Sequence, residues 1–218
     1  MPSESELALR LQQGLDQLQL ALSAQQQAQL LVYLSLLQKW NKAYNLTAIR
    51  DIDEMLVKHI LDSLSVAPFC GAATNLLDIG AGAGLPSVIL AIVYPGMQVS
   101  GLDSNIKKTR FMQQVGYELK LPNFHVFHAR ADTADLSTTF DIVISRAFSS
   151  FSDFVTLALP RLVPGGQIYA MKGRYPESEL AEASSLCDIN SVTPLSVPYL
   201  SEERHLITAT APSTQKVN

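Results

Sequence analysis

Residues 76–86 read LLDIGAGAGLP and are the most informative part of this chain. The first four form a short apolar run with one acid, which is typical of a buried parallel strand. The three glycines that follow, Gly80, Gly82 and Gly84, let the backbone turn tightly and come close to a ligand. The apolar run at 88–93 then predicts a helix that packs back on the sheet. A strand, a glycine-rich turn and a helix in this order indicate a pocket for a nucleoside cofactor.

Two acids near the glycines indicate which cofactor this is. Asp78 precedes them in a D-x-G-x-G-x-G pattern, whereas a dinucleotide site has G-x-G-x-x-G and holds a pyrophosphate at the helix N-terminus. A carboxylate at Asp78 would repel phosphate but suits the ammonium and sulfonium groups of S-adenosylmethionine. Asp103, nineteen residues after Gly84, ends the next apolar strand, where an acid can accept hydrogen bonds from ribose hydroxyls. The alternative is a structural glycine turn in which Asp78 only caps the helix.

Length and composition limit the class of protein. A chain of 218 residues is long enough for one α/β domain with an appendage, and its core needs no disulfide or metal. Cys70 and Cys187 have no C-x-x-C spacing and are expected to be free thiols. Acids near the N-terminus and a longest apolar run of seven residues (88–94) argue against a signal peptide and a membrane span. We therefore expect a cytoplasmic monomer that binds neither metal nor membrane.

The chain changes character near residue 74. Before it, Ser3 with Glu6 and Ser23 with Gln26 resemble capping boxes, so this part is expected to be helical. A stripe of apolar residues at helical spacing also predicts a helix here, and we expect its members to lie in the core: Leu30, Leu34, Leu37 and Trp40. We therefore divide the chain into a helical N-terminal extension (1–74), a Rossmann-like core (75–212) and a disordered tail (213–218).

After residue 74, strands and helices alternate. This alternation predicts a mostly parallel, twisted α/β sheet with helices on both faces and ligands at the carboxyl ends of its strands. The expected strands are 75–79, 99–103, 125–128, 140–145 and 167–171, with helices from about 87, 105 and 151. A turn is expected at 162–166 (LVPGG), and the runs 191–197 and 205–210 are expected to close the sheet as an antiparallel pair.

Four cations lie at or near strand ends. Arg146 follows the strand 140–145, Arg130 ends the strand before it, Lys172 ends the one after it, and Arg204 lies in the final hairpin. Because parallel strands end at one edge of the sheet, these side chains are expected to converge on the rim of the pocket. Residues 103–174 hold nine Lys/Arg against six Asp/Glu, although the whole chain has a net charge of −4. The alternative for each cation is an ordinary surface charge.

Five sequence blocks occur in one order: WNKAYNLT (40–47), HILDS (59–63), GLP (84–86), SRA (145–147) and ERH (203–205). Together they resemble the bacterial small-subunit ribosomal RNA methyltransferase G family, also called glucose-inhibited division protein B, over about residues 39–206. The resemblance implies a class I methyltransferase with a seven-stranded sheet and a helical extension. It implies methyl transfer from S-adenosylmethionine to N7 of a guanine near the decoding site of 16S rRNA, in the small subunit or an assembly intermediate.

The resemblance also implies roles for individual residues. Arg146 and Arg204 are the expected catalytic residues, in contact with RNA phosphate or the target guanine, and Arg130 and Lys172 support them in binding RNA. Guanine N7 has a free lone pair at neutral pH, so attack on the methyl group needs no general base, and orientation supplies most of the rate. The expected cofactor-binding residues are Asp78, Gly80, Gly82, Gly84, Leu85, Asp103, Ala131, Asp132 and Arg146.

The chain departs from the family pattern at two places. Asp132, expected near the adenine, stands where relatives often have Glu, and it could instead cap the turn before 133–136. Ser87 stands where many relatives have Gly, in the first turn of a helix, where either residue is tolerated. We expect cofactor binding to survive the change at Ser87, whereas the shorter side chain of Asp132 leaves its adenine contact open.

Other interpretations remain open at this point. His59 and Asp62 lie three residues apart and are expected to form a buried hydrogen-bonded pair, although Asn45 or His59 could instead lie near substrate. A nicotinamide-dependent oxidoreductase would need the G-x-G-x-x-G spacing, which this chain lacks. A noncatalytic RNA binder or cofactor sensor would be expected to lose part of the pocket, whereas Asp78, the glycines and Asp103 are all present.

Overall fold

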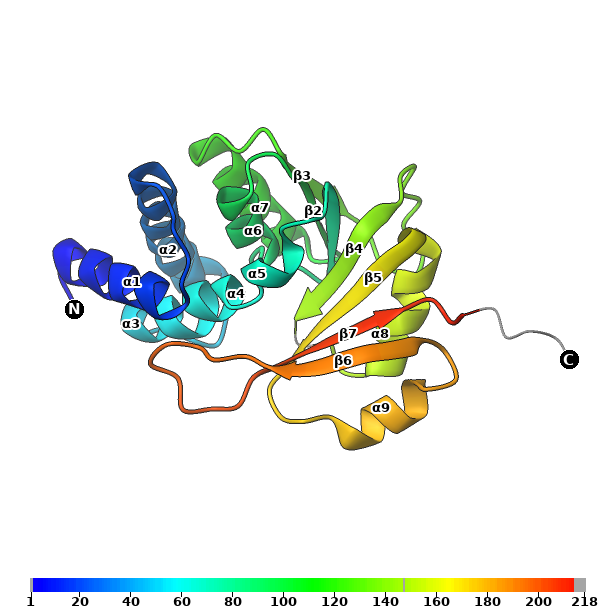
Figure 1. The fold of residues 1–218 in the computed structure, drawn as a ribbon. Coiled ribbons are helices and arrows are strands. Elements are labelled where there is room, and N and C mark those ends of the chain that lie inside the picture. The colour runs from blue at the N-terminus through cyan, green and yellow to red at the C-terminus, as the bar shows by residue number, and fades with distance from the viewer. Residues whose placement is uncertain (1, 147, 214–218) are drawn as a thin grey trace, which may run out of the picture.

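The computed structural model describes residues 2–146 and 148–213, and these form a seven-stranded sheet covered by helices on both faces (Figure 1). The strand order is β3-β2-β1-β4-β5-β7-β6. The first five strands along this order are parallel, and β7 runs antiparallel to both of its neighbours. The strands are β1 Asn75–Ile79, β2 Gln98–Asp103, β3 Phe124–His128, β4 Phe140–Arg146, β5 Leu162–Lys172, β6 Asp188–Pro194 and β7 His205–Thr210. The predicted fold class is confirmed.

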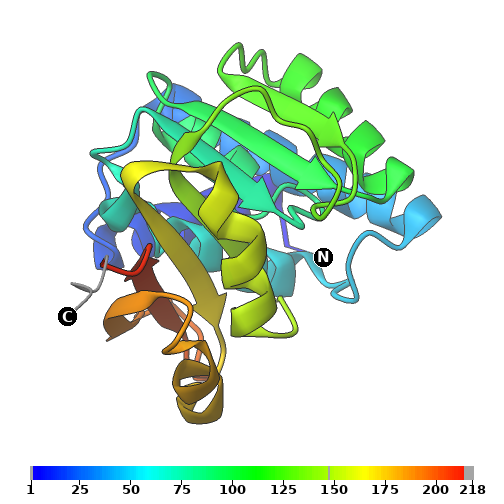
Figure 2. The ribbon, with the colours of Figure 1, turned by 90° about the vertical axis from the view of Figure 1, so that its right-hand side faces the viewer.

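Six helices of the described chain precede the first strand, and five follow it. Those before the first strand are α1 Glu4–Gln17, α2 Ala24–Tyr44, α3 Ile52–Met55, the π-helix η1 Leu56–Leu61, α4 Asp62–Leu64 and α5 Ala67–Cys70. Those after it are α6 Ser87–Val93, α7 Ile106–Glu118, α8 Phe151–Ala158, the short 3₁₀ helix η2 Leu159–Arg161 and α9 Glu177–Ala183. The N-terminal helices, α6 and α7 cover one face, and α8 and α9 cover the other (Figure 2).

The central strands contribute side chains to the apolar cores on both faces, because successive side chains point to opposite faces of the sheet. In β4, Ile142 and Ile144 pack with the N-terminal helices, α6 and α7, whereas Val143 packs with α8. The strand is therefore apolar on both sides, as a parallel strand between two helical layers must be. Among the described residues, no helix is both long and apolar enough to cross a membrane.

The N-terminal helices begin as the sequence predicts. Both capping boxes are present: the hydroxyl oxygens of Ser3 and Ser23 accept from the backbone N–H of Glu6 and Gln26, whose side chains accept from the two cap amides. The leucine stripe is buried, and the Trp40 ring lies 5.6 Å from that of Phe111 in α7. These helices share one apolar core with the sheet. The division into an extension and a core stays a prediction, and residues 214–218 of the predicted tail lie outside the described part of the chain.

The expected turn at 162–166 is wrong, because these residues belong to β5. Leu162 pairs with Phe140, but the next pairing joins Ile142 to Gln167, so the strand bulges between them. The bulge places Gly165 at φ +80°, where glycine is favoured. The edge strand β6 likewise begins and ends earlier than predicted, because its pairing with β7 joins Asp188 to Thr210 and Pro194 to His205.

Candidate active site

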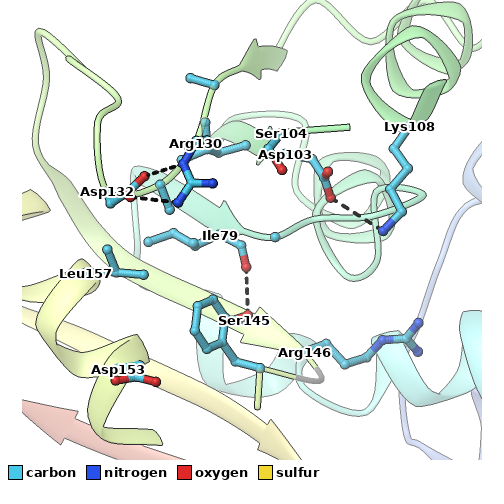
Figure 3. Close-up of a pocket in the computed structure, with 15 residues that line it drawn as sticks. Ile79, Asp103, Ser104, Lys108, Arg130, Asp132, Ser145, Arg146, Asp153 and Leu157 are labelled. Carbon is cyan, nitrogen blue, oxygen red and sulfur yellow. Dashed lines mark hydrogen bonds and ion pairs between the residues drawn. The ribbon is translucent and has the colours of Figure 1, made fainter. Parts of the chain in front are cut away.

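A cavity of about 540 Å³ opens at the carboxyl ends of β1, β2, β3 and β4 (Figure 3). This is the point where the strand order reverses, between β1 and β4, and such points hold the ligand in open α/β sheets. Five of the nine residues expected to bind the cofactor line this cavity: Gly80, Asp103, Ala131, Asp132 and Arg146.

Asp78 is fully buried in β1, one residue before the strand ends, and does not itself line the cavity. Its Oδ2 accepts from the backbone N–H of Ser87 at 3.2 Å, in the first turn of α6. Its Oδ1 has no hydrogen-bond partner among the described residues, and burial raises the pKa of the carboxyl to about 7. One oxygen therefore caps the helix, as the alternative interpretation held, while the other is available to a cationic ligand group. An unpartnered buried carboxylate oxygen fits the ammonium group of S-adenosylmethionine.

The glycine loop has the backbone conformation that its sequence predicts. Gly80, Gly82 and Gly84 have φ values of +73°, +61° and +84°, a region that side chains other than glycine disfavour. A Cβ at Gly84 would lie 2.5 Å from Val88 Cγ2, whereas a Cβ at Gly80 would meet no atom within 4 Å. Gly84 therefore serves helix packing, and Gly80 leaves open space on the cavity side.

Leu85 is buried in the core and, like Gly82 and Gly84, does not line the cavity. Its expected role in cofactor binding stays a prediction. Next to it, the Tyr33 hydroxyl of α2 donates to the Ala83 carbonyl oxygen at 2.8 Å. The helical extension thus bonds directly to the glycine loop, a contact that the sequence patterns did not predict.

Asp103 ends β2 at the cavity wall and is 8% exposed. Its Oδ2 accepts from the Gly82 N–H at 2.9 Å, and its Oδ1 accepts from the Asn105 N–H at 2.8 Å. Each carboxylate oxygen can accept a further hydrogen bond, so the side chain is both held in place and able to receive ribose hydroxyls. The Lys108 ammonium lies 3.8 Å from Oδ2.

Asp132 and Arg130 lie on the opposite rim of the cavity and form a two-point ion pair. Arg130 Nε and Nη2 donate to the two carboxylate oxygens at 3.1 and 2.9 Å, and the nearby cation lowers the pKa of Asp132. Both side chains are exposed, at 73% and 51% for Arg130 and Asp132. The expected adenine and RNA contacts of these residues stay predictions.

Arg146 and Arg204 converge on one carboxylate. Asp62, buried in the extension, accepts from Arg146 Nη1 at Oδ2 and from Arg204 Nε at Oδ1, each at 3.0 Å. Arg146 Nη1 also donates to the Lys58 carbonyl oxygen at 2.9 Å. In Figure 3 the Arg146 guanidinium turns away from the cavity centre towards the helical extension.

The expected His59–Asp62 pair is wrong, because Asp62 bonds to the arginines instead. His59 Nε2 lies 2.9 Å from Thr47 Oγ1, and burial together with the Arg146 cation lowers the pKa of His59 to about 4, so the ring is neutral at pH 7. Asn45 ends α2 in the left-handed conformation, and its Oδ1 accepts from the Arg50 guanidinium. The geometry therefore gives Asn45 and His59 structural contacts.

Lys172 is the least accessible of the four predicted RNA-binding cations. Its side chain is 10% exposed, and its ammonium donates to Glu179 at 2.7 Å and to the Phe148 carbonyl oxygen at 3.1 Å. All four cations thus form ion pairs with carboxylates. No group of three His, Cys, Asp or Glu side chains within residues 2–146 and 148–213 is arranged to hold a metal ion.

Solved structures with a similar fold are class I methyltransferases. The glycopeptide N-methyltransferase MtfA aligns with a TM-score of 0.60 at 13% identity, over 70% of this chain and 96% of that chain. A ribosomal protein L11 methylase from Lactobacillus delbrueckii aligns with a TM-score of 0.54 at 14% identity, over 70% and 77%. This chain thus has the class I methyltransferase fold, with its cavity at the carboxyl ends of the strands.

Sequence relatives are much closer and share nearly the whole chain. The model of the family described as rRNA small subunit methyltransferase G matches residues 26–207. Ribosomal RNA small subunit methyltransferase G of Burkholderia thailandensis is 46% identical over 212 residues, 94% of this chain and 92% of its own. The protein of that name from Pseudomonas aeruginosa is 48% identical over 199 residues, 90% and 92%. The chain belongs to this family, and S-adenosylmethionine is its cofactor.

Proposed function

We propose that this enzyme transfers the methyl group of S-adenosylmethionine to N7 of a guanine in 16S rRNA near the decoding site. The proposal rests on one observation: a chain with 46–48% identity to rRNA methyltransferase G over at least 90% of its length keeps an intact cofactor cavity bordered by two arginines. S-adenosylmethionine supplies an electrophilic methyl group on a sulfonium centre.

The chain's own residues act by binding and orienting. Asp78 presents a free carboxylate oxygen to a cationic group, and Asp103 presents two oxygens to hydroxyls. Arg146 lines the cavity, Arg204 meets it at Asp62, and in this proposal RNA enters on their side. Because the N7 lone pair is free at neutral pH, the residues need not remove a proton, and holding the two reactants in line supplies most of the rate.

The substrate in this proposal is rRNA folded in the small subunit or in an assembly intermediate, and the enzyme acts as a cytoplasmic monomer. Its predicted RNA-binding cations are already paired with acids, and the net charge is −4, so binding to naked RNA should be weak. We expect higher affinity for subunits lacking the modification than for random RNA of equal length. Equal affinities in a filter-binding comparison would contradict this expectation.

The test is transfer of labelled methyl from S-adenosylmethionine to small subunits lacking the modification, followed by mapping of the modified nucleoside. We expect 7-methylguanosine at one position. Asp78→Ala should abolish transfer by removing the cofactor carboxylate, and Arg146→Ala should reduce it about 100-fold by misplacing the substrate. Label in another nucleoside, or none in RNA despite bound cofactor, would refute the proposal.

A further inference from the structure

We infer that Asp62 is a positioning residue, which sets the orientation of Arg146, which lines the cofactor cavity, and of Arg204, which is bound to the same carboxylate. The inference rests on the proposed function, because it concerns the same site and the same reaction. Asp62 itself does not line the cavity, so it would act through the arginines and not on substrate.

The geometry joins three distant parts of the chain at one carboxylate. Asp62 begins α4, Arg146 ends β4, and Arg204 precedes β7, so 84 and 142 residues separate Asp62 from its partners. The Asp62 side chain is 4% exposed, and those of Arg146 and Arg204 are 22% and 19% exposed. Ion pairs with this degree of burial are screened little by solvent and hold a single arrangement.

The π-helix η1 supports this arrangement from the backbone. It ends one residue before Asp62, and its Lys58 carbonyl oxygen is the second acceptor for Arg146 Nη1. Single π-helical turns often occur at functional sites because they alter which groups face a neighbour. Here the turn presents a backbone carbonyl and a carboxylate to the same guanidinium, which fixes its plane as well as its position.

Arg204 Nη2 also pairs with Glu202 Oε2 at 3.1 Å, so two carboxylates, Asp62 and Glu202, balance the two guanidinium groups. Each arginine has five N–H donors, and only some of these are used by Asp62, Lys58 and the neighbours of Arg204. Asp62 therefore brings two like charges together at fixed places, and such fixed donors require little reorganisation when a substrate binds.

The experiment is single-turnover methylation of unmodified small subunits by the full-length enzyme and by Asp62→Asn, with saturating S-adenosylmethionine. We expect the rate to fall by roughly 10- to 100-fold, because displaced arginines would no longer hold the substrate in line with the methyl group. Cofactor affinity, measured by calorimetry, should stay within about twofold, because Asp78 and Asp103 are untouched. A wild-type rate for a folded Asp62→Asn enzyme would overturn the inference.

A matched control removes a different aspartate of the same extension. Asp53 in α3 forms an ion pair with Arg10 at 3.0 Å, far from the cavity lining, and Asp53→Asn should leave the rate unchanged. If Asp62→Asn does not fold, as circular dichroism would show, Asp62→Glu takes its place. Asp62→Glu keeps the negative charge but displaces it by one methylene. We expect the same loss of rate, and a wild-type rate for this variant would overturn the inference.

A double-mutant comparison separates positioning from a purely structural role. If Asp62 acts through Arg146 and Arg204, then Asp62→Asn should reduce the rate by less than about threefold in an enzyme that already carries Arg146→Ala and Arg204→Ala. If Asp62→Asn lowers the rate of this enzyme without the two arginines by the same factor as it lowers the wild-type rate, the inference is overturned. An inactive wild-type enzyme would instead refute the proposed function, so the two failures are distinguishable.

Discussion

Asp78 combines two roles in one side chain. Its Oδ2 accepts from the first turn of α6, and its Oδ1 is buried without a partner in the described structure. Leaving a buried polar atom unpaired is unfavourable, so such an atom indicates a place where a ligand completes the hydrogen bonding. Burial raises the pKa of this carboxyl to about 7, which makes its ionisation depend on pH in the neutral range.

The first prediction concerns cofactor affinity and pH. Below about pH 7, Asp78 is mostly protonated in the free protein and cannot pair with an ammonium group. Affinity for S-adenosylmethionine should therefore increase as pH rises from about 5 to about 7, by up to about tenfold per unit. Calorimetry at several pH values measures this, and Asp78→Asn should bind weakly with no such dependence. A wild-type affinity that is constant over this range would contradict the assignment.

The same pKa has a consequence for stability without cofactor. The unfolded chain releases the Asp78 proton near the ordinary aspartate pKa of 3.8, whereas the folded protein keeps it until about pH 7. The folded state thus binds more protons in this interval, and the Asp78 contribution to stability is lost as pH rises from about 4 to 7. Asp78→Asn should flatten that part of the pH profile in urea unfolding. An unchanged profile would show that Asp78 ionises normally when folded.

A pair of glycines gives a matched test of the cavity. Gly80 and Gly165 have φ values of +73° and +80°, and a Cβ on either would meet no atom within 4 Å. Alanine at each should destabilise the fold by a similar amount, about 1–2 kcal/mol, through backbone strain. Only Gly80→Ala should weaken S-adenosylmethionine binding, because only Gly80 lines the cofactor cavity. Equal affinities for the two variants would argue against the proposed cofactor position.

At the scale of elements, α2 organises the cofactor side of the molecule. Tyr33 bonds to the Ala83 carbonyl oxygen in the glycine loop, and Gln29 Nε2 donates to the Leu119 carbonyl oxygen at the end of α7, at 2.8 Å in each case. Gln26 donates to two carbonyl oxygens at the end of α6. Side chains of one helix therefore satisfy backbone groups that the ends of two other helices leave unpaired.

This arrangement predicts different effects for two substitutions on α2. Tyr33→Phe and Gln29→Ala each leave a carbonyl oxygen without its partner, so each should lower the free energy of unfolding by about 1–2 kcal/mol. Only Tyr33→Phe should also weaken cofactor binding, by a few fold, because only Tyr33 holds the glycine loop. Chemical denaturation and calorimetry measure the two quantities. A Tyr33→Phe enzyme with unchanged affinity would show that the loop keeps its shape without this bond.

At the scale of the whole molecule, the N-terminal helices complete the core. Leu34 and Leu37 of α2 belong to the same buried cluster as Leu76 of β1 and Ile144 of β4. Without the helices, one face of the sheet would expose this apolar surface to water, and each buried leucine or isoleucine contributes about 1.5–3 kcal/mol. The expected boundary near residue 74 therefore separates two kinds of secondary structure that share one core.

We accordingly expect a fragment that begins at residue 75 to fail to fold. The full chain should unfold in a single transition, because the extension and the sheet depend on the same core. Circular dichroism and urea denaturation of both proteins test this. A folded fragment that binds S-adenosylmethionine would contradict it and would support two independent units.

The sequence alone was sufficient for the alternation of strands and helices, the glycine loop and the two acids beside it. These features depend on local periodicity and on residues that are close in the chain, so their physical causes are visible in the sequence. The conformations of Gly80, Gly82 and Gly84 and the ends of β1 follow directly from the stretch at 76–86.

Only the tertiary structure decided which groups meet. The bulge at the start of β5 depends on its pairing with β4, so a Pro-Gly-Gly turn signal was misleading there. Of the four cations expected to converge on the rim of the pocket, Arg130 and Arg146 line the cavity and Lys172 and Arg204 do not, and the carboxylate partners of all four could not be read from spacing. Asp62 meets its two arginines across 84 and 142 residues, because the sheet order places the ends of β4 and β7 beside the helical extension.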